Sequence, residues 1–443
     1  MPKYLICLLL FSSFFASAQE LSMHEAMELA RKNNRTLQNA SADIQIARQK
    51  RLETIADGLP QISASAGYLN YPNQPVSVVP AEFFGGTPGT YTSLTFGLSQ
   101  SATAGLMVEQ VVFDGSYIVG LQAAQTYLQI SEQAFIKSEQ QVVTTTVESY
   151  VNALVAQAQL KVLEQNLVIA ERNYSDVLQL YENGLTEEEN VEQIGLTVAS
   201  LKSSVHYSQN MVRITKGIVH YIVGLPYDKP LVLTTTLEEL TLRAQKEALG
   251  DFRVAQNIDF LIAENDIEAN RLLLKLERAK ALPRISAFAS GGYDGFGETF
   301  DFFSAQQDWY PRTAVGLNIN FPVFSSFKAT AKKQQAKLAL EKSKRQSEDV
   351  VQRLLLEETS LRNEVQLYLK NIHTSSESLA LATRIEQKNQ IKFKEGMVSG
   401  YTLRQAQIQL YQAQNNYLTA MQQLVLAKAK LSLLLTPITP NNK

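Results

Sequence analysis

Side chains that commonly carry out chemistry are few in this sequence, and they are widely spaced. A helical zinc site needs two histidines one turn apart, but His24 precedes Glu25 without a second histidine nearby. The glycine-rich stretch 291–297 has the wrong spacing for a phosphate-binding loop, and no helix pattern follows it. The other histidines stand alone: His206, His220 and His373. We therefore predict that the protein is not an enzyme and binds neither a metal nor a cofactor.

The N-terminus has the pattern of a secretory signal peptide. Lys3 precedes an apolar run over 4–15, and the small residues 16–18 form a cleavage signal. Removal of 1–18 leaves 443 − 18 = 425 residues and also removes Cys7, the only cysteine, so disulfides and thiol catalysis are excluded. The alternative is the short N-terminal helix of a cytosolic protein; the apolar core is too short for a comfortable transmembrane helix.

Charge and composition exclude further classes of protein. The 41 basic and 43 acidic side chains give a net charge of −2, without the positive footprint of a nucleic-acid binder. A hydrophobic content of 45% with 9% aromatic residues argues against disorder. After the N-terminal segment the chain has no run of 18 apolar residues, so we predict no membrane-spanning helix.

Three short motifs recur in the same order, which indicates an internal duplication. The segment 59–64 returns at 282–287, an offset of 223, and Val112-Phe113 returns as Val323-Phe324, an offset of 211. The segment 181–184 returns at 393–396, an offset of 212. The first copy therefore carries 223 − 211 = 12 extra residues between its strand-like segments. We divide the mature chain into two repeats, 19–230 and 231–443.

Each repeat contains two segments with the period of two that is typical of a β-strand. Apolar side chains occupy one face and Ser, Thr, Gly and Asn the other, as expected of a strand between lipid and an aqueous lumen. A strand of a soluble β-sandwich shows the same alternation. The neighbouring segments must therefore distinguish a membrane strand from a soluble one. The predicted strands lie at about 61–71, 94–113, 284–293 and 312–323.

A very long helix follows the second strand of each repeat. The stretch 121–181 contains neither proline nor glycine, and neither does 326–394. At ~1.5 Å per residue each helix is about 100 Å long, which a compact globule cannot contain. Gly184 and Gly396 end these helices in the manner of a left-handed cap, and a return helix follows each. The predicted helical hairpins span about 115–224 and 326–435.

The return helix of the second repeat has the clearest apolar seam. Its spacing of three and four residues implies a left-handed coiled coil, and subtracting 212 gives the same phase in the first repeat. Ala420 lies in this seam, so Ala420→Leu should overpack it, whereas Gln422 is predicted on the opposite face. The seam positions are Leu403, Ala406, Leu410, Ala413, Tyr417, Ala420, Leu424, Ala427, Leu431 and Leu434.

Four strands per chain cannot stand alone in a bilayer, where every backbone donor and acceptor must be paired. Known transmembrane barrels begin at eight strands, so several chains must contribute to one barrel. Two chains would give eight strands and three would give twelve.

The duplicated order of strands, long helices and Tyr/Phe-x-x-Gly turns resembles the TolC-like outer-membrane efflux proteins over nearly the whole mature chain. The resemblance implies a mainly helical fold with a transmembrane β-barrel, in a homotrimer of four strands per chain and twelve in total. It also implies an outer-membrane location in a Gram-negative bacterium, with a helical tunnel across the periplasm. An adaptor protein and an inner-membrane pump would power this passive export duct for small compounds or polypeptides, in a tripartite efflux or type I secretion system.

The same resemblance assigns functional residues to the two helical turns, where the adaptor binds and the periplasmic end closes. A simpler interpretation, that the glycines only cap the helices, is compatible with this role. The residues are Tyr181, Gly184, Leu185 and Thr186 in the first turn, and Phe393, Gly396, Met397, Val398 and Ser399 in the second.

Charge at the entrance departs from the family pattern. Many relatives carry aspartates six and nine residues beyond the second glycine, but Thr402 and Gln405 stand there in this chain. Glutamates at the start of the first return helix are the candidate replacement, although the helix dipole also favours them there. These are Glu187, Glu188, Glu189 and Glu192.

Aromatic residues at the strand ends predict the girdles that meet the membrane interface. They are Tyr68, Tyr71, Tyr293, Trp309 and Tyr310. The rival interpretation, an exported structural or adhesive coiled coil without a channel, does not explain the two pairs of amphipathic strands.

Overall fold

The computed structural model describes residues 19–227, 230–248 and 250–436, so the predicted signal peptide 1–18 lies outside the described residues. The described chain forms two compact units. The sheet unit comprises residues 45–130 and 265–345, and the helical unit comprises the described residues before 45 with 131–264 and 346–436.

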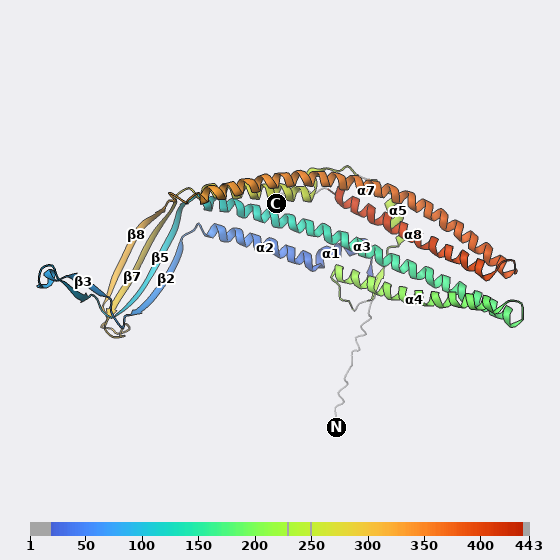
Figure 1. Ribbon diagram of the computed structural model, residues 1–443, viewed down its shortest axis with the longest axis horizontal. Helices are drawn as coiled ribbons and strands as arrows, with labels where there is room; N and C mark the ends of the chain where they lie inside the picture. The colour runs from blue at the N-terminus through green and yellow to red at the C-terminus, as the bar shows by residue number, and fades with distance from the viewer. Residues whose placement is uncertain (1–18, 228–229, 249, 437–443) are drawn as a thin grey trace, which may run out of the picture. The chain divides into compact units, whose positions relative to one another are not determined.

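The sheet unit contains a four-stranded antiparallel sheet with the order β2-β5-β7-β8 (Figure 1). Helices join these strands at one end of the sheet, because α2 and α6 precede β2 and β7, whereas α3 and α7 follow β5 and β8. The four predicted barrel strands are therefore present. The strands are β2(Gln61–Asn70), β5(Gln100–Asp114), β7(Arg284–Gly297) and β8(Trp309–Asn320); the helices are α2(Arg35–Ala56), α3(Gly115–Glu182), α6(Ile258–Ala279) and α7(Lys328–Lys394).

The predicted strand 94–113 was wrong at its beginning. β5 starts at Gln100, and the preceding strand β4(Tyr91–Thr95) pairs instead with β3(Val76–Pro80) in a separate hairpin that also carries the 3-10 helix η1(Ala81–Phe84). Gly97 has a φ of +91°, which interrupts the extended chain between β4 and β5. The alternation of residue types continues through this break, so the sequence pattern could not reveal it.

The other strand bounds differ by a few residues. β2 ends at Asn70 instead of 71, and β7 extends to Gly297 instead of 293 because it pairs with β8 up to Gly295 and with β5 up to Gly297. β8 runs from Trp309 to Asn320 instead of 312–323, because residues 309–311 already pair with 293–295 and the ladder ends where Asn320 faces Arg284, the first residue of β7.

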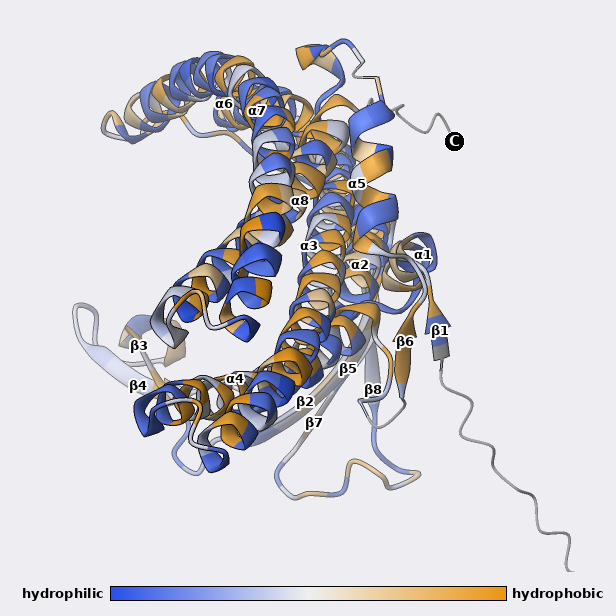
Figure 2. Ribbon diagram, turned by 90° about the vertical axis from the view of Figure 1, so that its right-hand side faces the viewer, coloured by the Kyte–Doolittle hydropathy of each residue, from blue (hydrophilic) through white to orange (hydrophobic). Residues whose placement is uncertain are grey.

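The helical unit has a small parallel pair of strands, β1(Gln19–Leu21) and β6(Leu231–Leu233). A helix with a capping box follows each: α1(Met23–Asn33) after Ser22, and α5(Leu237–Lys246) after Thr236. Tyr150 of α3 is fully buried here, and its hydroxyl donates to the Leu21 carbonyl at 2.8 Å. β6 appears as a short continuous hydrophobic strand in Figure 2. A short 3-10 helix, η2(Val254–Gln256), precedes α6.

The long helices fold back as predicted, α3 onto α4(Glu188–Val223) and α7 onto α8(Gly400–Leu435). The predicted seam of α8 is confirmed from Leu403 to Leu431, where every position except the partly buried Tyr417 is buried. α8 also buries Gln407, Met421 and Lys428 outside the seam, so it contacts more than its own partner helix. By length and composition α8 is the one described helix apolar enough to cross a membrane, but it packs in the core of the helical unit.

Candidate functional site

The first helical turn (181–186) ends α3 in a Schellman motif. The Leu185 amide donates to the Leu180 carbonyl at 2.8 Å, and the Gly184 amide donates to the Tyr181 carbonyl at 2.9 Å. Gly184 has a φ of +73°, and a Cβ placed on it would meet no heavy atom within 4 Å. Only backbone conformation, not space, therefore requires glycine at this position.

The second turn (393–399) repeats this geometry at the end of α7. The Met397 amide donates to the Lys392 carbonyl at 2.8 Å, and the Gly396 amide donates to the Phe393 carbonyl at 3.0 Å. Gly396 has a φ of +69° and the same open surroundings. Ser399 is the N-cap of α8, with its hydroxyl accepting from the Thr402 amide. Ser399 and Thr402 therefore have a capping role.

Asn190, which sequence reasoning missed, connects the two turns. Its side-chain nitrogen donates to the Thr186 hydroxyl at 3.1 Å, and its oxygen accepts from the Gly400 amide at 3.3 Å. A Cβ on Gly400 would lie 2.8 Å from that oxygen, so glycine permits the close approach. The two turns lie at the same end of the paired hairpins in Figure 1. No sequence motif distinguishes Asn190 from the other polar residues of α4.

The predicted contact residues differ in exposure. Leu185 and Met397 are each 73% exposed, and Tyr181 is also exposed, whereas Val398 is half-buried. Phe393 packs against the apolar cluster of the first hairpin that includes Val177 and Ile194. The turns thus present two unpartnered aliphatic side chains, while Phe393 joins the hairpins.

The four candidate glutamates lie at the exposed start of α4. Glu187 is the N-cap residue without a side-chain capping bond, and Glu189 accepts from Gln193 at 2.9 Å. The first turn of α8 contains no acidic residue. At the start of the return helices, negative charge is therefore found in the first repeat only.

A ladder of amide side chains joins the two hairpins. Asn152, Gln159, Asn166 and Asn173 recur every seven residues along α3. Each makes a hydrogen bond of 2.7–3.3 Å to an amide of α7 or α8; the partners are Gln422, Asn415, Gln414 and Gln390. Gln422, predicted on the face opposite the seam, contacts Asn152 of α3 there, because α8 faces α3 as well as α7. Apolar seams hold each hairpin together, whereas neutral amides pair one hairpin with the other.

One buried carboxyl lies near this ladder. Glu386 of α7 is 6% exposed, and burial raises its pKa, although a hydrogen bond with Gln407 lowers it in part. Burial, together with the negative charge of Glu386, raises the pKa of Tyr411 to about 12. The pKa of Tyr411 therefore depends on the charge of Glu386.

The strand register divides the four-stranded sheet into two faces. Ile62, Val108, Ala289 and Val315 form one row of the apolar face. The other face is polar and carries Asp294, which pairs with Arg312 at 3.2 Å. This sidedness is what a strand between lipid and water requires.

The predicted aromatic girdle is only partly on the apolar face. Tyr68, Tyr293 and Trp309 lie there, but Tyr310 lies on the polar face because adjacent residues of a strand point in opposite directions. Tyr71 follows β2, and its amide donates to the Ser99 carbonyl at 2.8 Å. Aromatic residues of the β7–β8 loop pack onto this group: Phe300 is 5.1 Å and Phe302 is 5.9 Å from Tyr68 between ring centroids.

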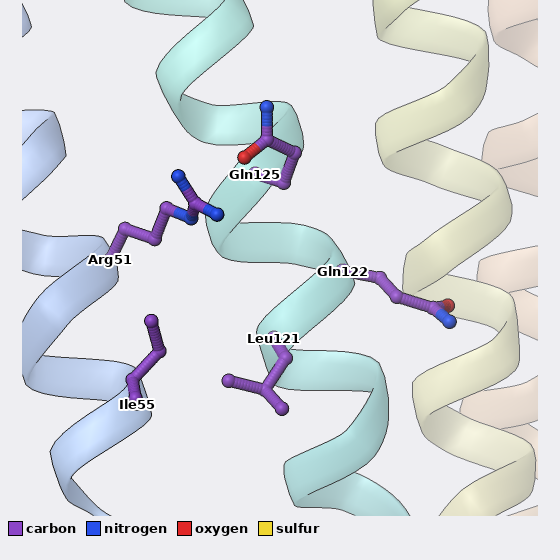
Figure 3. A pocket seen from close by; sticks show the side chains of 5 residues that line it. All are labelled: Arg51, Ile55, Leu121, Gln122 and Gln125. Atoms are coloured by element: carbon purple, nitrogen blue, oxygen red, sulfur yellow. The ribbon is translucent and has the colours of Figure 1, made fainter.

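A groove of about 780 Å³ lies between α2 and α3 in the sheet unit (Figure 3). Arg51 and Ile55 lie across it from Leu121 and Gln125, while Gln122 points away and accepts from Lys275 of α6 at 2.8 Å. This lining has no pair of nucleophile and base. Among the described residues, no group of three His, Cys, Asp or Glu side chains could hold a metal ion.

Comparison with known proteins gives a consistent result. The model of the outer membrane efflux protein family matches residues 26–203 and 254–436. The alkaline protease secretion protein AprF of Pseudomonas aeruginosa is 22% identical over 332 residues, which cover 71% of this chain and 67% of AprF.

Solved structures extend the likeness to nearly the whole fold. The CmeC outer membrane channel of Campylobacter jejuni aligns with a TM-score of 0.74 at 14% identity, over 93% of this chain and 85% of CmeC. The outer membrane protein VceC of Vibrio cholerae aligns with a TM-score of 0.70 at 17% identity, over 93% of this chain and 94% of VceC.

Proposed function

The chain belongs to the outer membrane efflux protein family, and from this membership we propose that three copies close one barrel and form one export duct. The membership itself makes the protein an outer-membrane efflux channel that extends into the periplasm, in a family of channels, not enzymes. The duplicated family match also rules out a coiled coil without a channel. We propose four further properties beyond family membership. They are trimer formation, the partners, the cargo and the division into repeats 19–230 and 231–443.

The open edges of the sheet support the trimer. β2 and β8 are the outer strands of the order β2-β5-β7-β8, so each has one side without a strand partner in the chain. Unpaired backbone groups are costly in hydrocarbon, and pairing β8 of one copy with β2 of the next removes both edges. Three copies of four strands give a twelve-stranded barrel. Its apolar face would meet lipid, and the face with Asp294 and Arg312 would line the lumen.

The helical turns are the proposed docking and closing end. Leu185 and Met397 are exposed aliphatic side chains on turns that Asn190 holds together. An adaptor protein would bind these apolar tips and transmit the action of an inner-membrane pump. The glutamates of α4 would supply negative charge at the entrance.

The proposed cargo belongs to two chemical classes. We propose passive export of small compounds or polypeptides. The similarity to a protease secretion protein supports polypeptides as cargo. Deletion of the gene followed by a panel of toxic compounds and a comparison of secreted proteins would separate these classes.

Gel migration and cross-linking test the assembly. Outer-membrane fractions should contain a species that migrates differently before and after heating, and cross-linking in detergent should give a trimer as the largest specific product. A stable monomer inserted in the membrane would contradict the proposal, because its sheet edges would be unpaired.

A further inference from the structure

We propose that residues 321–345, here called the collar segment, bind the anionic phospholipid headgroups of the leaflet next to the helical end of the sheet. The segment contains the end of the β8 connection and the first turns of α7, all within the sheet unit. The proposal rests on the proposed function in one respect: the apolar face of the sheet must meet lipid.

The first part of the collar segment is aromatic and exposed. Phe321 continues the alternation of Leu317 and Ile319 beyond the end of β8, so it extends the apolar face. Phe324 and Phe327 are 80% and 79% exposed. Ser326 and Phe327 have φ values of 48° and 67°, a left-handed conformation that is unfavourable for residues other than glycine. This turn leaves three aromatic rings unpacked where a membrane interface would accept them.

The second part is strongly basic. It has seven cationic side chains and one anionic side chain, Glu341, for a net charge of 7 − 1 = +6. All seven are exposed, and none of them makes an ion pair among the described residues. Lysine stems are long enough to lay apolar carbons along a surface and place the charge in the headgroup layer. The cations are Lys328, Lys332, Lys333, Lys337, Lys342, Lys344 and Arg345.

The equivalent junction of the first repeat shows that the fold itself does not require this charge. Residues 110–134, at an offset of 211, contain no basic residue and two acidic ones, Asp114 and Glu132. The start of α3 is packed instead: the Tyr117 hydroxyl donates to the Ile55 carbonyl at 3.2 Å, and Val119 lies in a cluster with Leu272. The start of α7 has no comparable cover over residues 328–335.

A neighbouring copy would not neutralise the collar segment. If β8 of one copy pairs with β2 of the next, α7 lies nearest to the neighbour's α2. Residues 45–57 carry Arg48, Lys50 and Arg51 against Glu53 and Asp57, a net charge of 3 − 2 = +1. An anionic lipid surface provides the missing complement, and juxtamembrane clusters of Lys and Arg are attracted to such surfaces.

The test measures retained lipid on the full-length trimer. Trimers reconstituted in mixed phosphatidylglycerol and phosphatidylethanolamine are extracted, and co-purifying lipid is quantified by native mass spectrometry. The test variant is Lys328→Gln, Lys332→Gln, Lys333→Gln and Lys337→Gln together. A matched control neutralises four other exposed lysines without ion pairs, Lys161→Gln, Lys246→Gln, Lys370→Gln and Lys388→Gln. A charge-retaining variant, with the four collar lysines changed to Arg, checks that substitution alone does not matter.

We expect wild type, control and Arg variants to prefer phosphatidylglycerol, with the preference weakening in high salt. The Gln variant should lose the preference by about tenfold or more, because each cation near an anionic surface contributes roughly fivefold. Equal preference in the Gln variant and wild type would overturn the proposal. So would unchanged lipid binding combined with a shift in ion selectivity of single-channel currents, since the lysines would then face the lumen. Absence of a heat-modifiable trimer in wild type would instead contradict the proposed function.

Discussion

The two repeats share one scaffold but differ where they meet other molecules. Both begin with a short strand and a helix with a capping box, and both long helices end in a Schellman turn with open space around its glycine. The first return helix starts with exposed glutamates, whereas the second starts with a serine cap and no acid. The first long helix begins packed and uncharged, and the second begins bare and basic. Heptads and helix caps thus determine the shared scaffold. The two repeats differ in charge and packing at the strand–helix junctions and after the helical turns.

Core burial gives the largest expected difference between the repeats. Leu424 of α8 is fully buried, whereas its counterpart Val212 in α4 is half-buried. Leu424→Ala should lower the free energy of unfolding by about 2–5 kcal/mol, and Val212→Ala by less than half of that. Denaturant unfolding of the trimer in detergent measures both. Equal losses would mean that the two hairpins are packed alike.

The turn glycines come next, with a predicted effect on export. Valine at Gly396 must adopt a left-handed backbone, which costs about 2 kcal/mol locally and displaces Met397. Export and cross-linking to the adaptor should fall, while outer-membrane abundance stays normal. Ser203→Val, at an exposed position within α4, is the control that keeps export. Wild-type export in the double variant Gly184→Val with Gly396→Val would show that the turns are not the docking site.

The amide ladder predicts a coupled pair of substitutions. Gln422→Leu removes the donor to Asn152, and because Asn152 is exposed and water can replace the donor, the cost should be about 0.5–1 kcal/mol. Adding Asn152→Leu should restore part of this loss, because two apolar side chains of similar size then face each other. A double-mutant cycle on unfolding measures the coupling. Strictly additive losses would exclude a direct contact between these two side chains.

Glu386 predicts the smallest effect, visible as a pH dependence. Burial raises its folded-state pKa above the ordinary value of 4.5, so its contribution to stability is full below that pH and is lost as the pH rises through the raised pKa. Glu386→Gln should therefore match wild type near pH 4 and become the more stable protein toward neutral pH. Thermal unfolding across this range tests the sign; a variant that is less stable at neutral pH would contradict it.

The heptad seams, long helices and turn glycines could be predicted because local periodicity determines them. Eight of the ten seam positions mapped onto α4 are buried, from Val191, Ile194, Val198, Leu201, Val205 and Ser208 to Val219 and Ile222. The β3–β4 hairpin could not be predicted, because Leu94, Phe96 and Leu98 alternate like a continuation of β5. Only the φ of Gly97 and the pairing with β3 distinguish them.

Contacts between segments that are distant in the sequence could not be predicted either. Asn190 and Gln422 gain their partners from the opposite hairpin, over sequence separations of 210 and 270 residues, so no local pattern reports them. Tyr310 lies at a strand end, as the girdle pattern requires, but its neighbour Trp309 occupies the apolar face, so Tyr310 points to the polar face.

Closure of the barrel between copies is the central claim, and cross-linking of the sheet edges tests it most directly. The chain's only cysteine lies within the predicted signal peptide, so introduced cysteines would be unique in the mature protein. Ala66→Cys on β2 is combined in turn with Thr313→Cys, Val315→Cys or Leu317→Cys on β8, all on the apolar face. Oxidation of outer membranes should give a covalent trimer as the largest species for at least one pair. Membrane-inserted protein that yields only monomer with every pair, or a larger ring, would contradict the account.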